Sequence, residues 1–112
     1  MSAMSLKEVA DMIAETKLPN AYYEFPDDTE QAPPFICFFY PTATDIFADN
    51  SNFVRKCRLV VELYTDNKDV TQEAVVESVL KSHELTFAKD ETYIAAERMY
   101  QVVYEMEVII NE

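Results

Sequence analysis

The sequence predicts an α+β fold, a two-layer sandwich in which a four- or five-stranded, mainly antiparallel sheet packs two helices on one face. Two observations support this prediction. Two segments repeat apolar residues at helical spacing, and four or five others collect aromatic and β-branched residues as strands do. The predicted order is α-β-β-β-α-β-β, and 112 residues make a single domain around one core.

The first predicted element is a helix that begins after Ser5. Ser5 and Glu8 have the spacing of a capping box, in which the two side chains satisfy each other's backbone amides. Pro19 is expected to end the helix, because proline cannot continue the backbone hydrogen bonds. The apolar residues that recur on its inward face are Leu6, Val9, Met12 and Ile13.

Two strands are predicted next, over residues 20–25 and 35–40, joined by an acidic loop between prolines. Residues 42–52 are expected to be irregular. The stretch from Ala48 to Asn52 contains the residue types that best tolerate left-handed turn geometry in the absence of glycine. A second turn, also built with aspartate and asparagine, is predicted at 66–69.

Residues 53–65 alternate clearly enough to predict a long strand with one apolar face and one mixed face. Cys57 and Leu59 belong to the apolar face, and Arg58 and Glu62 to the mixed one. Asp69 or Thr71 is expected to cap a second helix that runs to about residue 83, with an inward stripe of four apolar residues. The inward stripe of the second helix comprises Val75, Val76, Val79 and Leu80.

A short strand at 85–88, which can continue to 94, and a long strand at 99–110 complete the sheet.

The composition excludes most enzyme classes. The chain has no glycine, so it has neither the phosphate-binding loops nor the nucleophile elbow that require one. His83 is the only histidine, and we expect it to cap the second helix or to be exposed. Asp66, Asp69 and Glu73 lack the calcium-loop pattern and predict a turn, a cap and a solvated first turn. We therefore expect no enzyme activity, no cofactor and no metal.

The charge balance disfavours one class of partner, nucleic acid. Nine basic residues against twenty-one acidic ones give a net charge of −12, which disfavours direct binding to nucleic acid. No apolar stretch approaches the length of a membrane span, and no secretory signal is recognised at the N-terminus, so we expect an intracellular protein. In a reducing compartment Cys37 and Cys57 should be free, buried thiols.

Aromatic residues are more numerous than a small two-layer core usually hides. Most are expected in the core, but Phe47 falls in the segment predicted to be irregular, where a monomer would expose it. The only basic cluster follows closely, at residues 55–58. We therefore predict an oligomer or partner interface that comprises Phe47, Asp49, Asn50, Phe53, Arg55 and Arg58.

Several short strings of the sequence carry a resemblance to a known family. They lie at 21–25, 33–36, 45–50 and 91–94. The most specific part is the Glu-Leu-Tyr-Thr-Asp string at 62–66, with Glu73 and Glu77, followed by Tyr-Gln-x-x-Tyr-Glu at 100–105. Together these strings resemble a family of small proteins from the structural-gene region of long-tailed phages and prophages of Gram-positive bacteria.

The resemblance implies a tail-completion or tail-terminator protein, which forms a ring, typically of six copies, between the phage tail tube and the head-tail connector. The protein would then occur in the host cytoplasm during assembly and afterwards in the virion. A neck or head-closure adaptor remains an alternative, as does an acidic DNA mimic that inhibits a host protein. If a ring forms, the residues predicted to face its opening are Asp27, Asp28, Glu30, Glu62, Glu105 and Glu107.

Overall fold

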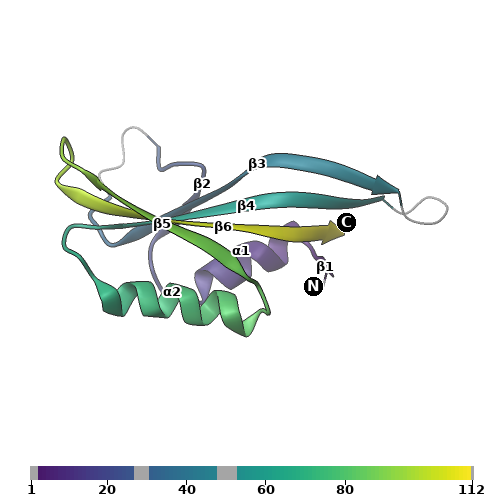
Figure 1. The fold of residues 1–112 in the computed structure, drawn as a ribbon, viewed down its shortest axis with the longest axis horizontal. Helices are drawn as coiled ribbons and strands as arrows, with labels where there is room; N and C mark the ends of the chain where they lie inside the picture. The colour runs from purple at the N-terminus through teal and green to yellow at the C-terminus, as the bar shows by residue number, and fades with distance from the viewer. Residues whose placement is uncertain (1–2, 27–30, 48–52, 112) are drawn as a thin grey trace.

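The computed structural model describes residues 3–26, 31–47 and 53–111. It confirms the predicted fold class, because two helices lie against one face of a mixed, six-stranded sheet (Figure 1). The predicted order of elements is also confirmed, with one short strand added before the first helix. The elements are β1 (Ala3–Met4), α1 (Leu6–Ala14), β2 (Asn20–Tyr22), β3 (Phe35–Phe47), β4 (Phe53–Thr65), α2 (Val70–Ser82), β5 (Phe87–Ile94) and β6 (Met99–Asn111).

Both helices begin where the sequence indicates. Ser5 Oγ accepts a hydrogen bond from the Glu8 amide at 3.0 Å, and Glu8 Oε1 accepts one from the Ser5 amide at 3.0 Å, so the capping box is confirmed. The side chain of Asp69 caps α2 by accepting from the Gln72 amide at 3.0 Å. Helix α1 ends at Ala14, earlier than Pro19 suggested. Within the described ranges no helix is long and apolar enough to cross a membrane.

The sheet is antiparallel at its centre and parallel at two short margins. Its strand order is β1-β6-β4-β3-β2, and β5 pairs with β6 on the same side as β1. The pairs β3–β4, β4–β6 and β5–β6 are antiparallel, whereas β1–β6 and β2–β3 are parallel. The predicted strand at 20–25 is shorter than expected, because the backbone of Tyr23 turns to a φ of 67° directly after β2.

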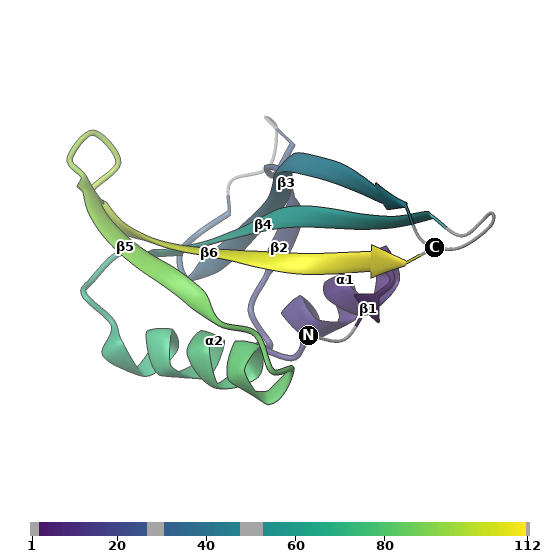
Figure 2. The same ribbon diagram turned by 45° about the vertical axis from the view of Figure 1, so that its right-hand side comes forward.

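The core lies between the helices and alternate residues of β3, β4 and β6 (Figure 2). Cys57 and Leu59 are buried there, as their alternation in the sequence predicted. Leu6 is the exception in the predicted helix stripe, because 45% of it is exposed. The residues that are buried completely, or nearly so, include Val9, Met12, Ile13, Ile36, Leu59, Val61, Leu63, Val76, Leu80, Val102, Tyr104 and Val108.

The prediction of an irregular segment at 42–52 is wrong for its first six residues, which are part of β3. The register of β3 against β4 shifts between Phe39 and Thr42, so the chain passes Pro41 through an irregularity and then pairs regularly again to Phe47. A bulge of this kind accommodates a proline, which cannot donate a ladder hydrogen bond. Residues 42–47, 53–58 and 107–111 together form the distal sheet, in which β3 and β4 extend past the helices (Figure 1).

The glycine-free chain makes left-handed turns at positions that the sequence did not indicate. Lys17, Tyr23, Glu84 and Arg98 have φ values between 52° and 67°. Each of them follows a helix or a strand or precedes the next strand, where the chain must change direction. The predicted turn at 66–69 is confirmed, because the chain bends there between β4 and α2, and none of its residues has a positive φ. The predicted turn at Asp49–Asn52 lies outside the described residues.

Candidate functional site

The sheet face that points away from the helices is the strongest candidate for a contact surface, and we call it the open face. The strand registers and the alternation of side chains assign its members. Figure 2 shows both helices on the opposite side of the sheet. The open face includes Phe35, Cys37, Phe39, Thr42 and Thr44 of β3, Lys56, Arg58, Val60, Glu62 and Tyr64 of β4, Gln101, Val103, Glu105 and Glu107 of β6, and Ala88, Asp90 and Thr92 of β5.

A hydrogen-bonded triad lies at one end of the open face. The hydroxyl of Tyr64 donates to Glu62 Oε1 at 3.0 Å, and Gln101 Nε2 donates to Glu62 Oε2 at 3.1 Å and to the Tyr64 hydroxyl at 2.9 Å. Burial raises the pKa of Glu62, although the hydrogen bond from Tyr64 partly opposes this. The triad joins β4 to β6, so the two strings most specific to the resemblance meet at one point of the sheet.

Aromatic rings cover the neighbouring part of the open face. Tyr23 stacks on Phe39 with ring centroids 5.5 Å apart, and Phe35 stacks on Tyr64 at 4.8 Å. Cys37 lies on this side of the sheet and is only 6% exposed, and burial raises the pKa of its thiol to about 11. Both cysteines are buried and neither is in a disulfide, as predicted, and they lie on opposite faces of the sheet.

Three of the six predicted acidic residues share the open face. Glu105 and Glu107 are exposed there, and Glu62 is half-buried in the triad. Lys56 Nζ lies 3.2 Å from Glu107 Oε2, so one member of the basic cluster pairs with a carboxylate on the neighbouring strand β6. The other three predicted residues, Asp27, Asp28 and Glu30, lie outside the described residues.

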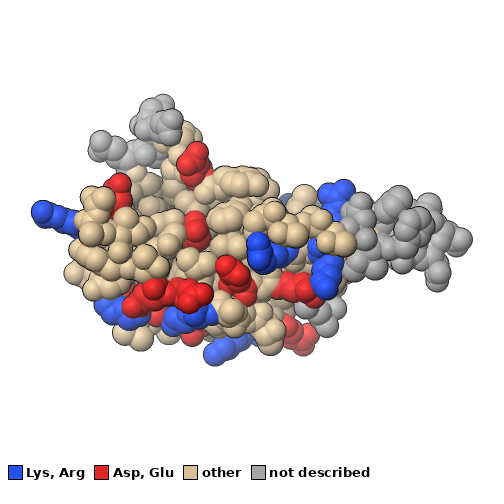
Figure 3. Space-filling model, turned by 45° about the horizontal axis from the view of Figure 1, so that its top comes forward, with Lys and Arg blue, Asp and Glu red and all other residues tan. Residues whose placement is uncertain are grey.

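The residues predicted to form an interface do not share one surface of the sheet. Phe47 and Phe53 pair across the ends of β3 and β4, while Asp49 and Asn50 lie outside the described residues. Arg58 is on the open face, where its Nη2 lies 3.5 Å from Thr42 Oγ1. Arg55 points to the helix side, three residues away in sequence but on the opposite face. Figure 3 shows basic side chains gathered at the distal end of the molecule.

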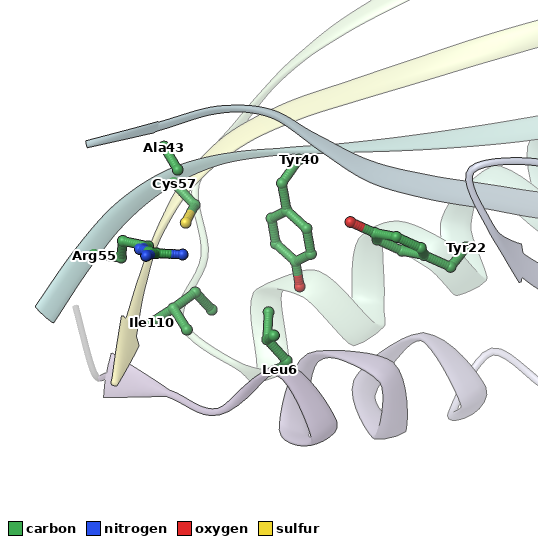
Figure 4. Close-up of a pocket in the computed structure, with 7 residues that line it drawn as sticks. All are labelled: Leu6, Tyr22, Tyr40, Ala43, Arg55, Cys57 and Ile110. Atoms are coloured by element: carbon green, nitrogen blue, oxygen red, sulfur yellow. The ribbon is translucent and has the colours of Figure 1, made fainter. Parts of the chain in front are cut away.

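Arg55 borders a hollow that sequence reasoning missed. The hollow has a volume of about 420 Å³ and lies between α1 and the underside of the distal sheet (Figure 4). Its residues come from five different elements, so no local pattern in the sequence could have indicated it. It is lined by Leu6, Tyr22, Tyr40, Ala43, Arg55, Cys57 and Ile110.

On the helix side, a charged network ties α2 to the sheet. Glu73 is only 2% exposed, so the prediction that it belongs to a solvated first turn is wrong. Its two oxygens accept from Lys68 at 2.6 Å and Lys89 at 2.8 Å, and Glu77 accepts from Lys89 at 2.7 Å and from the Tyr104 hydroxyl at 2.9 Å. Burial alone would raise the pKa of Glu73, but the hydrogen bonds from the two lysines lower it below its usual value.

His83 ends α2, in agreement with the prediction that it caps this helix. Its Nε2 lies 2.7 Å from Glu15 Oε2, so it also links the C-terminal ends of the two helices. Glu62, Glu73 and Glu77 each contact two other side chains, at least one of them on another element, so these three carboxylates hold elements together.

Comparisons with known proteins give one informative result. No protein-family model matches the chain, and no curated protein matches it. Among the solved structures that are similar is a chain from the "Virion of native gene transfer agent (GTA) particle", with a TM-score of 0.57 and 11% sequence identity. The match covers 96% of this chain and 89% of that one. At this identity the likeness establishes a shared fold over nearly the whole length.

Proposed function

We propose that this protein is a structural component of a phage-type virion, a tail-terminator or tail-completion protein that forms a ring between the tail tube and the head-tail connector. The observation that carries the proposal is the fold shared over 96% of the chain with a protein of a gene transfer agent particle. Because a fold hosts many functions, the proposal also needs support from the surfaces of the molecule.

The surfaces of the molecule fit a role in assembly better than a role in catalysis. The best-connected carboxylates among the described residues, those of Glu62, Glu73 and Glu77, are committed to hydrogen bonds that join strands and a helix. The open face, by contrast, presents a broad area with aromatic rings at one end and charges of both signs at the other. Such a mixture of apolar, aromatic and charged groups is typical of surfaces that dock on proteins.

The acidic character fits a position around a passage for DNA. Glu105 and Glu107 are exposed on the open face, and the chain as a whole carries a net charge of −12. An opening lined by like charge would keep DNA from adhering to the wall as it passes. A DNA mimic would instead need a continuous stripe of carboxylates, and Lys56 and Arg58 interrupt the acidic residues of the open face.

The test is to mix the purified protein with the tail-tube protein of the same phage or prophage and to examine the mixture by negative-stain microscopy. We expect rings, and tubes whose ends are capped by a ring. A variant with Glu105→Lys and Glu107→Lys should still cap tubes if these residues face the opening and not a subunit contact. The absence of both rings and capped tubes would contradict the proposal. Binding to the connector protein alone would favour the neck alternative.

A further inference from the structure

Among the residues that the structure describes, each side of the sheet has a longer stretch of strand edge without a neighbouring strand, beside the short end strands β1 and β2. On one side, β2 pairs with β3 only along Ile36–Phe38, so the outer edge of β3 in the distal sheet has no neighbouring strand. On the other side, β5 pairs with β6 alone, and residues 88–93 of β5 are all exposed. An unpaired strand edge presents backbone N–H and C=O groups that a strand of another chain can pair with.

On the open face, the charged side chains next to the two edges are opposite in sign. Beside the β3 edge, Arg58 of β4 extends over Thr42 of the outer strand, with Nη2 at 3.5 Å from Thr42 Oγ1. On β5, Asp90 is the one carboxylate on the open face, since it pairs in register with Val103. Glu91 and Lys89 of β5 point to the helix side, where Lys89 is held by Glu73 and Glu77.

We propose that the β3 edge of one copy pairs with the β5 edge of the next copy, with Thr42 opposite Asp90 and Thr44 opposite Ala88. The strand directions support this arrangement. In the order β5-β6-β4-β3 each strand is antiparallel to its neighbour, so a second copy placed in the same sense continues the sheet with an antiparallel pair. The guanidinium of Arg58 then lies beside the Asp90 carboxylate of the adjoining copy.

Charge disfavours the two symmetric alternatives. Pairing of β3 with β3 would bring two Arg58 side chains together, and pairing of β5 with β5 would do the same to two Asp90 side chains. A contact between two different edges is head-to-tail, and such a contact forms a closed ring or a filament. The β3 edge is at the distal end and β5 at the other end of β6, so successive copies are staggered along the strands, as a closed sheet requires.

The proposal rests on the proposed function only in taking the neighbour to be a second copy of this chain. In the resulting ring both helices lie on one side of the sheet wall and the open face on the other. Glu62, Glu105 and Glu107 then share one surface of the ring, as predicted for the lining of an opening.

The experiment uses pairs of single-cysteine additions on exposed positions, oxidised in the free protein at high concentration and again with tail tubes present. We expect a disulfide between Thr44→Cys in one copy and Ala88→Cys in another, because opposite residues of an antiparallel pair approach within disulfide reach. Glu91→Cys, on the other face of β5, is the matched control and should not cross-link to Thr44→Cys. Cross-linking of Thr44→Cys only to itself, or none in either condition, would overturn the proposal.

A charge exchange provides an independent readout. Arg58→Glu and Asp90→Lys should each weaken self-association about tenfold, and the double variant should restore it. Equal weakening in the double variant would overturn the pairing of these two residues. Tubes that are capped without the Thr44–Ala88 cross-link would refute this contact and leave the proposed function standing. Cross-linked rings that do not bind tail tubes would support this contact and contradict the proposed function.

Discussion

The carboxylate of Glu73 connects α2 to the turn before it and to β5, because it accepts hydrogen bonds from Lys68 of that turn and from Lys89 of β5. Lys68 also contacts Glu91 of β5. Glu73 is almost fully buried, so the removal of its charge would take one carboxylate partner from each lysine and leave Lys68 with Glu91 and Lys89 with Glu77. The stability of the α2–sheet contact therefore depends on this side chain being ionised.

We predict that Glu73→Gln lowers the free energy of unfolding by about 2 kcal/mol at pH 7, the usual range for a hydrogen bond to a charged group. Because the pKa of Glu73 is lowered in the folded protein, its contribution is complete above the unfolded value of about 4.3 and disappears as the pH falls through the folded value. Urea unfolding at several pH values measures this difference.

The matched control is Asp11→Asn, which removes the exposed pair between Lys7 and Asp11 on α1. A surface pair four residues apart on a helix contributes at most about 0.5 kcal/mol. Equal losses for Glu73→Gln and Asp11→Asn at pH 7 would contradict the importance assigned to the buried carboxylate.

Glu62 should show the opposite dependence on pH. Burial raises its pKa in the folded state, so ionisation at neutral pH opposes folding. We predict that Glu62→Gln increases the free energy of unfolding at pH 7 and that the gain disappears below about pH 4, where the carboxyl is protonated in both states. Glu105→Gln, exposed on the same face, should leave stability nearly unchanged. A loss of stability for Glu62→Gln at pH 7 would indicate that the triad needs the carboxylate.

At the scale of elements, the β5–β6 hairpin shows how a chain without glycine makes its turns. Residues 95–98 connect the two strands, and the Arg98 amide donates to the Ala95 carbonyl at 3.3 Å while its φ is 52°. A left-handed conformation costs a residue with a Cβ atom about 1–2 kcal/mol. Arg98→Gly would remove this cost from the folded state. Glycine also increases the conformational entropy of the unfolded chain, which offsets part of the gain in stability.

We therefore predict that Arg98→Gly raises the free energy of unfolding by about 0.5 kcal/mol or more. Ala74→Gly, at an exposed position inside α2, is the control for glycine itself and should lower it by about 1 kcal/mol. Thermal or urea unfolding of both variants decides the matter. If Arg98→Gly were destabilising to the same extent as Ala74→Gly, the turn would carry no conformational cost.

Elements whose signal is local were predictable. The Ser5 cap, the Asp69 cap and the alternation along β4 and β6 each depend on residues within a few positions of one another, and the structure has them where expected. The same alternation placed Glu62, Glu105 and Glu107 on one face.

Features that depend on distant partners were missed. Residues 42–47 contain an Asp and follow a proline, which indicates irregular chain, but β4 supplies a partner strand that keeps them extended. The burial of Glu73 depends on Lys89, and the hollow beside Arg55 depends on five separate elements. None of these contacts has a spacing in the sequence that could reveal it.

At the scale of the whole molecule, the sheet is longer than the helices that cover it, with overall dimensions of 50 × 30 × 22 Å. Its open face, and the edges of β3 and β5 that have no neighbouring strand among the described residues, are therefore left for contacts outside the chain. On the open face, Arg58 lies beside one of these edges and Asp90 on the other. This organisation fits a subunit of a ring better than a self-contained monomer. It also predicts that assembly weakens as salt screens the Arg58–Asp90 contact between copies.

The central claim is that copies of this chain close into a ring on the end of a tail tube. The most direct test measures the mass in solution of the protein alone and after mixing with the tail-tube protein, by light scattering coupled to gel filtration. We expect mixing to produce a species that contains a fixed whole number of 12.9-kDa chains, whatever the excess of this protein. A mass that stays at one chain in both samples would contradict it.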